Sequence, residues 1–312
     1  MPKTNPGFIT DHVKFCANGA WIEKRQQRIM TNSTSRTISL GTAAITVINV
    51  GNMVLELSEV MNVPESEWRP RYALAFEKPL PFPSQSVHIA LPDASILVDA
   101  NNYAIAVPPG SPYLPPNYQS PPSLLDQLHE KGIRPRDITH LVITHAHFDH
   151  YVGTTIESDG TYIPTFPNAR CYLGRADWED PEMQTSLKDP ASDESHTFGV
   201  LYQRGLLELV EGNRTLTPAV QLIAAPGESA GHQLIRVHSE GQTLYCLGDL
   251  YHHLVEVEQP TWMATWANPD TNITSRHALV EAALAENAIL VAAHMPIGRL
   301  QRTPTGVTWV EV

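Results

Sequence analysis

Short apolar runs separated by polar turns recur along the chain, and they predict an α/β protein. Four of these runs have the length and composition of buried strands: residues 44–50, 138–143, 244–247 and 289–293. Residues 87–91 and 95–99 form two further runs around a Pro-Asp turn, which predicts a β-hairpin. Apolar residues at helical spacing in 275–286 predict a helix that leads directly into the run at 289–293.

The segments between these runs carry turn and capping signals. Residues 107–122 are rich in proline and predict a loop. Ser123 with Asp126 forms a capping-box pattern, and Gly132 is expected to end the helix that follows. Asn101, two residues after Asp99, is of a residue type that tolerates a left-handed backbone, and we expect that conformation there. Residues 1–36 differ in character and are expected to form an N-terminal extension to one domain at 37–312.

Composition narrows the class of protein. The 312 residues are 42% hydrophobic and 17% charged, which is enough for one large core. The net charge of −12 and the lack of any Lys/Arg cluster argue against a nucleic-acid partner. The apolar stretch at 38–57 is interrupted by polar residues, so it predicts strands and not a membrane span. With no secretory signal pattern and three widely spaced cysteines, we expect free thiols and a cytoplasmic protein.

The most specific chemistry follows the run at 138–143. His145, His147, Asp149 and His150 bring three imidazoles and a carboxylate into one short segment. Residues i and i+2 point the same way on an extended backbone, so His145 and His147 can reach one ion. Asp149 and His150 lie just beyond and can face a second ion. Neutral imidazole and carboxylate together suit zinc and similar divalent ions.

Three later residues extend this set of candidate ligands. His232 follows a turn flanked by glycines, whereas Asp249 and His294 each follow an apolar run. Taken singly, each of them is more often a hydrogen-bonded structural residue than a ligand. Because they follow the first motif at the ends of expected strands, we predict that they share one cleft with it.

On these residues, the chain from about Thr37 onward resembles the metallo-β-lactamase superfamily. The resemblance implies an αββα sandwich, in which two mixed β-sheets lie face to face with helices outside. It also implies two metal ions, expected to be zinc, with iron, manganese and cobalt as alternatives. One ion would be held by His145, His147 and His232, the second by Asp149, His150 and His294, with Asp249 bridging both.

The implied chemistry is hydrolysis. Two divalent ions can lower the pKa of a bridging water, and the resulting hydroxide attacks a carbonyl or phosphoryl centre. Asp149 or Asp249 is the expected proton shuttle. Residues 165–178, 248–253 and 266–276 resemble the lactonase branch and its organophosphate-hydrolase relatives. His252 stands where N-acyl-homoserine lactonases have a substrate-contacting tyrosine, so it either donates to substrate or supports a metal ligand.

The substrate pocket is less specified by the sequence. Apolar residues beside the motif loops are candidates for its wall, with core or dimer packing as the alternative: Met53, Phe148, Tyr251, Trp262, Met263 and Trp266. Residues 65–83 resemble an arm that covers the partner subunit's site in similar lactonases, so we expect a homodimer. We predict a quorum-quenching lactonase acting on small lactones or esters. The alternatives are an organophosphate triester or aryl ester hydrolase, and a non-catalytic ligand-binding sensor.

Overall fold

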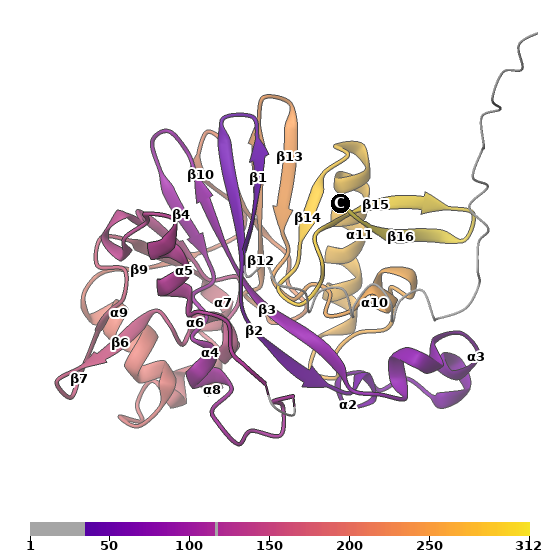
Figure 1. Cartoon of the computed structure of the whole chain (residues 1–312), viewed down its shortest axis with the longest axis horizontal. Helices are drawn as coiled ribbons and strands as arrows, with labels where there is room; N and C mark the ends of the chain where they lie inside the picture. Colours follow the sequence, from indigo (N-terminus) through magenta and orange to yellow (C-terminus); the bar gives the residue numbers. More distant parts are fainter. Residues whose placement is uncertain (1–34, 116–117) are drawn as a thin grey trace, which may run out of the picture.

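The computed structural model describes residues 35–115 and 118–312, and its centre is a pair of seven-stranded mixed sheets (Figure 1). The first sheet contains, in order across it, β1 (Ser35–Leu40), β2 (Ala43–Leu55), β3 (Leu80–Ala90), β4 (Ser95–Val98), β5 (His140–Val142), β8 (Arg170–Gly174) and β9 (Leu207–Val210). The second contains, in chain order, β10 (Arg214–Thr217), β11 (Val220–Ala224), β12 (Gln233–Ser239), β13 (Gln242–Cys246), β14 (Ile289–Val291), β15 (Gly298–Thr303) and β16 (Gly306–Glu311). A separate ribbon pairs β6 (Thr155–Ser158) with β7 (Thr161–Pro164).

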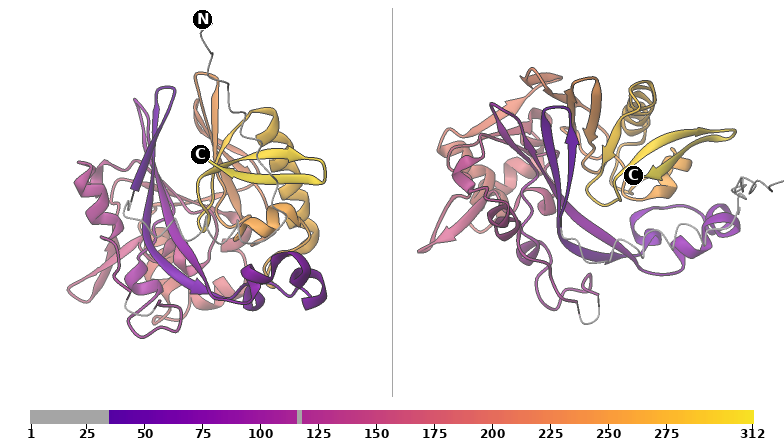
Figure 2. Two further views of the ribbon diagram at one scale, coloured as in Figure 1. Left: turned by 45° about the vertical axis from the view of Figure 1, so that its right-hand side comes forward. Right: turned by 45° about the horizontal axis from the view of Figure 1, so that its top comes forward.

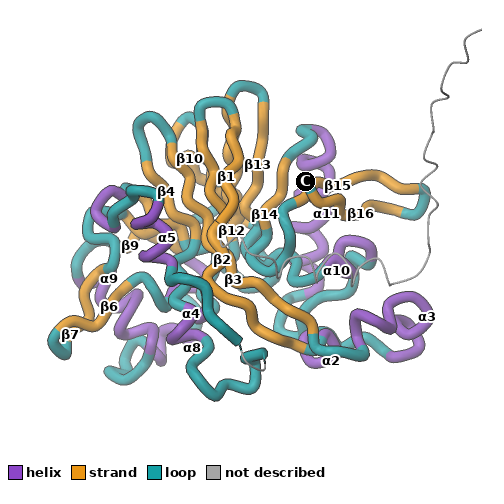
Figure 3. Tube along the Cα trace, in the orientation of Figure 1, coloured by secondary structure: helices purple, strands orange, loops and turns teal. Residues whose placement is uncertain are grey.

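Helices lie outside the two sheets, which confirms the predicted αββα sandwich (Figures 2 and 3). On the side of the first sheet the chain forms α4 (Tyr103–Ala106), α5 (Leu124–Glu130), α6 (Phe148–Tyr151), α7 (Arg175–Trp178), α8 (Pro181–Ser186) and α9 (Val200–Gln203), with short turns η1 (Pro135–Asp137) and η2 (Ser195–Gly199). On the side of the second sheet lie α10 (Leu254–Glu258) and α11 (Pro269–Ala285). No helix in the described ranges is both long and apolar enough to cross a bilayer.

Alternation along the strands separates three apolar cores. In β4, Ile96 and Val98 face the space between the sheets, where they meet residues of β12 and β13. Leu97, between them in sequence, belongs instead to the core between the first sheet and the helices that cover it. Tyr245 of β13 likewise points outward to the core beneath α11. Each central strand is therefore buried on both faces, which explains why these strands read as continuous apolar runs.

The local predictions are largely confirmed. β3 and β4 form the expected antiparallel hairpin, and the Ser123–Asp126 capping box opens α5. Gly132, at φ 76°, adopts the left-handed backbone that follows the helix. The last helix begins earlier than its apolar spacing predicted, at Pro269, because the Asn268 side chain accepts the Thr271 N–H and caps it.

The two segments expected at the periphery have different outcomes. Residues 1–34 of the predicted extension, including Cys16, lie outside the described residues. Ser35, within the predicted extension, is the first residue of β1 and pairs with Ile48 of β2. The expected arm, residues 65–83, consists of α3 (Glu65–Phe76) and the start of β3, and α2 (Leu57–Val60) precedes it. The arm packs on its own chain. Trp68 stacks on Phe76 at 5.0 Å between ring centroids, and Phe76 meets Trp262 edge-on. Contact of this arm with a partner subunit stays a prediction.

Candidate metal centre

The candidate residues gather at one edge of the sandwich, where parallel strands of both sheets end. In the first sheet, the parallel strands β4 and β5 lead to Asp99 and to the segment 144–150. In the second sheet, the parallel pair β13 and β14 leads to Asp249 and His294. Parallel strands present their carboxyl ends at the same edge, so side chains that are far apart in sequence meet there.

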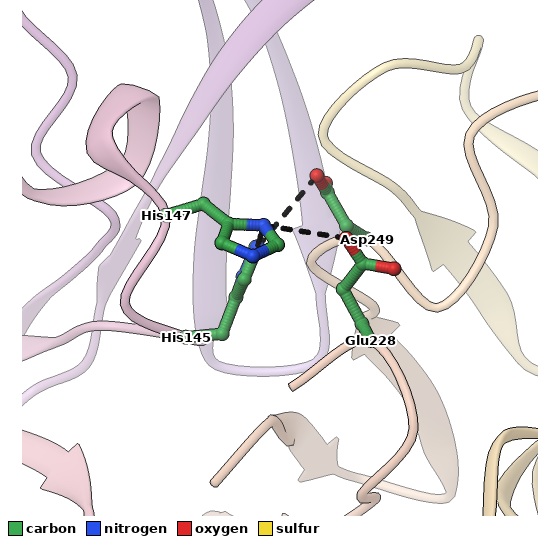
Figure 4. Close-up of side chains that lie close together, drawn as sticks. All are labelled: His145, His147, Glu228 and Asp249. Carbon is green, nitrogen blue, oxygen red and sulfur yellow. Dashed lines mark hydrogen bonds and ion pairs between the residues drawn. The ribbon is translucent and has the colours of Figure 1, made fainter. Parts of the chain in front are cut away.

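One group of possible metal ligands consists of His145, His147, Glu228 and Asp249, whose ligand atoms lie within 4.8 Å of one another. His145 Nε2 lies 2.8 Å from His147 Nδ1, and His147 Nδ1 lies 3.3 Å from Glu228 Oε1. His145 Nε2 is also 3.8 Å from Asp249 Oδ2. Figure 4 shows the two imidazoles on one side and the two carboxylates opposite them.

The second group consists of Asp149, His150 and His294. Asp149 Oδ1 lies 3.6 Å from His150 Nε2, and Asp149 Oδ2 lies 3.5 Å from His294 Nε2. Asp249 Oδ2 is 3.2 Å from both of these Nε2 atoms. Asp249 therefore touches both groups, and it occupies the central position that the sequence motif implied for it.

The first group differs from the expected one in a single member. Glu228 is a member of it and His232 is not, although the His232 ring lies 5.3 Å from that of His145. His232 Nδ1 donates to the Ala225 carbonyl at 3.0 Å, and its Nε2 accepts the Asp249 N–H at 3.3 Å. Its Nε2 lone pair thus points towards Asp249, at the border of the group.

For two of these histidines the protein fixes which ring nitrogen faces the centre. His150 Nδ1 donates to Asp99 Oδ2 at 2.9 Å, and His294 Nδ1 donates to the Pro83 carbonyl at 2.7 Å. With Nδ1 protonated and bonded, Nε2 carries the free lone pair, as in metal-ligating histidines. Among the described residues, Asp249 Oδ1 and Glu228 Oε2 are buried without a hydrogen-bond partner. Each of these two carboxylates turns its other oxygen, Asp249 Oδ2 or Glu228 Oε1, towards the imidazoles. Buried carboxylates opposite imidazole nitrogens fit divalent cations.

Two carboxylates hold the loops that carry these ligands. Asp99 accepts the Thr144 N–H at 2.8 Å and the Thr144 hydroxyl at 2.9 Å, and this fixes the start of the His-rich segment. Asp99 itself has φ 57°, so the left-handed residue expected at Asn101 is in fact Asp99, and that expectation was wrong. Because the tight turn comes directly after β4, the Asp99 carboxylate can point back to Thr144.

The second supporting carboxylate, Asp177 of α7, joins two different loops. It accepts the Ala146 N–H at 2.9 Å, the Ser229 hydroxyl at 2.9 Å and the Gly231 N–H at 2.5 Å. The loop 144–147 and the loop 227–231 are thereby held together. Sequence reasoning missed the roles of Asp177 and Glu228. The one available signal was that each lies inside a segment already singled out, beside Trp178 and His232 respectively.

His252 reaches the centre from the loop after β13. Its Nε2 lies 3.4 Å from Glu228 Oε1 and 3.6 Å from Asp249 Oδ2, while its backbone N–H donates to Glu256. Burial lowers the pKa of His252, but the Glu228 and Glu256 carboxylates outweigh it and hold that pKa well above its usual range. Burial raises the pKa of Asp249, but His294 and His150 outweigh it and hold that pKa well below its usual range.

The candidate pocket residues separate into two kinds. Tyr251 is 1% exposed, with the Arg276 guanidinium over its ring, and Met53 and Trp262 are also buried in apolar cores. All three contribute to core packing, and their contact with a substrate stays a prediction. Met263 is partly buried against the core between the first sheet and its helices. Phe148 and Trp266 are about half exposed, at 48% and 52%, and Trp266 meets both His147 and His252 edge-on.

The sandwich fold with a cluster of imidazoles and carboxylates at its strand ends defines a class of metal-dependent hydrolases. The chain belongs to the metallo-beta-lactamase superfamily: the family model matches residues 86–294, more than half of the chain. An N-acyl homoserine lactonase of Bacillus cereus is 26% identical over 120 residues, which cover 38% of this chain and 41% of that protein. A second such lactonase, from a Bacillus species, is 25% identical over 117 residues, or 40% of its length.

Solved structures share the fold over nearly the whole chain. The hydrolase AbOPH of the beta-lactamase superfamily superimposes with a TM-score of 0.72 at 17% identity, covering 90% of this chain and 98% of that one. AidC, a dizinc quorum-quenching lactonase in complex with its product, gives a TM-score of 0.71 at 19% identity, covering 90% and 99%. At these identities the likeness establishes the fold alone.

Proposed function

We propose that this protein is a dinuclear metal-dependent hydrolase that opens lactone rings. The observation that carries the proposal is the position of Asp249, whose Oδ2 lies within 3.8 Å of His145 Nε2 and 3.2 Å of both His150 Nε2 and His294 Nε2. One carboxylate between two sets of imidazoles suits two ions held side by side. The matched segments of N-acyl homoserine lactonases support a lactone as the substrate.

The residues divide between holding ions and moving protons. His145, His147 and His232 would hold one ion, and Asp149, His150 and His294 the other, with Asp249 shared. Bound divalent ions supply Lewis acidity towards the substrate carbonyl and lower the pKa of a water. The Asp149 carboxylate, between His150 and His294, is placed to take the proton of the attacking water and to return it to the leaving alcohol.

His252 provides the remaining polar contact. Its ring lies parallel to that of His294, with 6.1 Å between centroids and 9° between planes, and its Nε2 faces the shared carboxylate. From there it would donate a hydrogen bond to the substrate carbonyl or support the ligands from behind. Tyr251 is buried beneath the Arg276 guanidinium, so it is not placed to supply a phenol here, and an aryl ester or phosphotriester remains a compatible second class of substrate.

A substrate panel with metal analysis tests the proposal. Wild type should contain two divalent ions per chain and hydrolyse acyl-homoserine lactones or simple lactones faster than aryl esters and paraoxon-like triesters. His294→Ala should empty one site and abolish most turnover. His238→Ala, which removes an exposed imidazole bonded to Thr243, is the matched control and should change neither. Full metal content without turnover of any panel member would contradict the proposal and favour a ligand-binding sensor.

A further inference from the structure

Glu228 is a buried carboxylate at the centre that the family motif does not include. It lies in the loop between β11 and β12, is 3% exposed, and its Oε1 accepts the Trp266 indole N–H at 2.5 Å. The same oxygen lies 3.3 Å from His147 Nδ1 and 3.4 Å from His252 Nε2. Among the described residues, its Oε2 has no hydrogen-bond partner. The carboxylate therefore turns Oε1 towards His147, and a buried carboxylate is costly unless donors or a cation face it.

The loop holds Glu228 in one position. Gly227 has φ 149°, and a Cβ at this residue would lie 2.4 Å from the Asn272 Cα, so only glycine fits. The Gly227 carbonyl accepts the Asn268 N–H at 2.8 Å, and Ser229 is bonded to Asp177 on the other side. Both flanks of Glu228 are therefore tied to the body of the protein, and its carboxylate is directed into the centre by the backbone.

With two dications bound, the net charge of the centre would favour a third carboxylate. Asp99 is committed to Thr144 and His150, and Glu256 is committed to Arg276. Only Asp149 and Asp249 would then offset two dications, and a bound hydroxide would still leave one positive charge in a buried site. A third carboxylate reduces the net positive charge of the centre, which lowers the cost of burying the ions.

We propose that Glu228 is a ligand of the ion held by His145 and His147, positioned by the Trp266 indole. The inference rests on the two-ion centre proposed above and adds an oxygen donor to the ligand set that the sequence motif implies. Carboxylate donors favour the harder divalent ions. With Glu228 as a ligand, the first site should therefore bind manganese better, relative to zinc, than it would with imidazoles and Asp249 alone.

The test compares metal binding by wild type, Glu228→Gln and the control Glu194→Gln, all as full-length chains. Glu194 is a partly buried carboxylate bonded to the Tyr151 hydroxyl, apart from the two ligand groups. Loss of a supporting neighbour typically weakens metal binding about 10- to 100-fold, so loss of a ligand should cost at least about 10-fold. Glu228→Gln should weaken one of the two sites by that factor and lose manganese affinity more than zinc affinity. Glu194→Gln should match wild type.

The visible spectrum of the cobalt-substituted protein gives a readout independent of activity, because it responds to the ligand set. It should change in Glu228→Gln and stay unchanged in Glu194→Gln. Trp266→Phe, which keeps the carboxylate but removes its N–H donor, should retain two ions with reduced affinity at one site. Wild-type affinities and an unchanged cobalt spectrum in Glu228→Gln would overturn the inference, whether or not turnover fell. If wild type itself bound no ions, the proposed two-ion centre would fail instead.

Discussion

Replacing Arg276 by methionine should destabilise the fold more than any other single loss of charge outside the metal centre. Arg276 is 1% exposed on α11, and its guanidinium lies 2.6 Å from Glu256 Oε1, itself fully buried. It also donates to the carbonyls of Leu250, Pro260 and Trp262, at 3.0, 3.2 and 2.6 Å. The segment that carries His252 and α10 is therefore organised around one cation.

The magnitude follows from what the substitution leaves behind. Methionine fills a similar volume, so the cavity term is small. Removing one partner of a buried ion pair costs about 3–5 kcal/mol, because the other charge stays buried. The three carbonyls lose their donor as well, which brings the expected total to about 4–6 kcal/mol of the free energy of unfolding. Most domains have only about 5–15 kcal/mol of stability, so this variant should be close to unfolding.

Urea unfolding at pH 7, followed by circular dichroism with a chelator present, measures the loss without a contribution from bound metal. The matched control is Arg302→Met, which breaks an exposed pair with Glu281 and should cost less than about 1 kcal/mol. Adding Glu256→Gln to Arg276→Met should recover part of the loss, since the stranded charge is gone. If Arg276→Met cost no more than Arg302→Met, the pair would contribute nothing and the reasoning would be refuted.

Three further predictions concern the site and the stability of the fold. Asp177→Asn should weaken metal binding about 10- to 100-fold in equilibrium dialysis, because the NH2 group of the amide cannot accept the Ala146 or Gly231 N–H. Unchanged affinity would show that metal binding does not depend on Asp177 joining the two loops. Asp249→Asn should lower turnover by at least about 100-fold and reduce metal content, and a near-normal rate would make Asp249 structural. Burial lowers the pKa of His88 to about 4 from 6.5. The unfolded chain then binds a proton that the folded protein excludes, so this stability is complete above pH 6.5 and falls by up to about 3 kcal/mol towards pH 4. His88→Gln should flatten that dependence in urea midpoints measured at pH 7 and 4.5, and an unchanged slope would show that other groups cause it.

The sequence by itself determined several central strands, the family and the motif. Residues in β4, β5, β13 and β14 are buried on both faces, so each strand is a continuous apolar run that is visible without a structure. Each candidate ligand follows such a run or a Gly-flanked turn. The capping box of α5 and the hairpin of β3 with β4 were equally accessible, because local hydrogen bonds and turn chemistry decide them.

Only the tertiary structure decided which side chains meet. Glu228 and Asp177 reach the centre through loop geometry, and no spacing rule relates them to His145. The same holds for His232, which lies at the border of its expected group, and for Tyr251, which is buried beneath the Arg276 guanidinium. Sequence patterns report whether a position is buried and where an element ends. They do not encode the long-range packing that turns one loop towards another, because that packing is set by the whole sandwich at once.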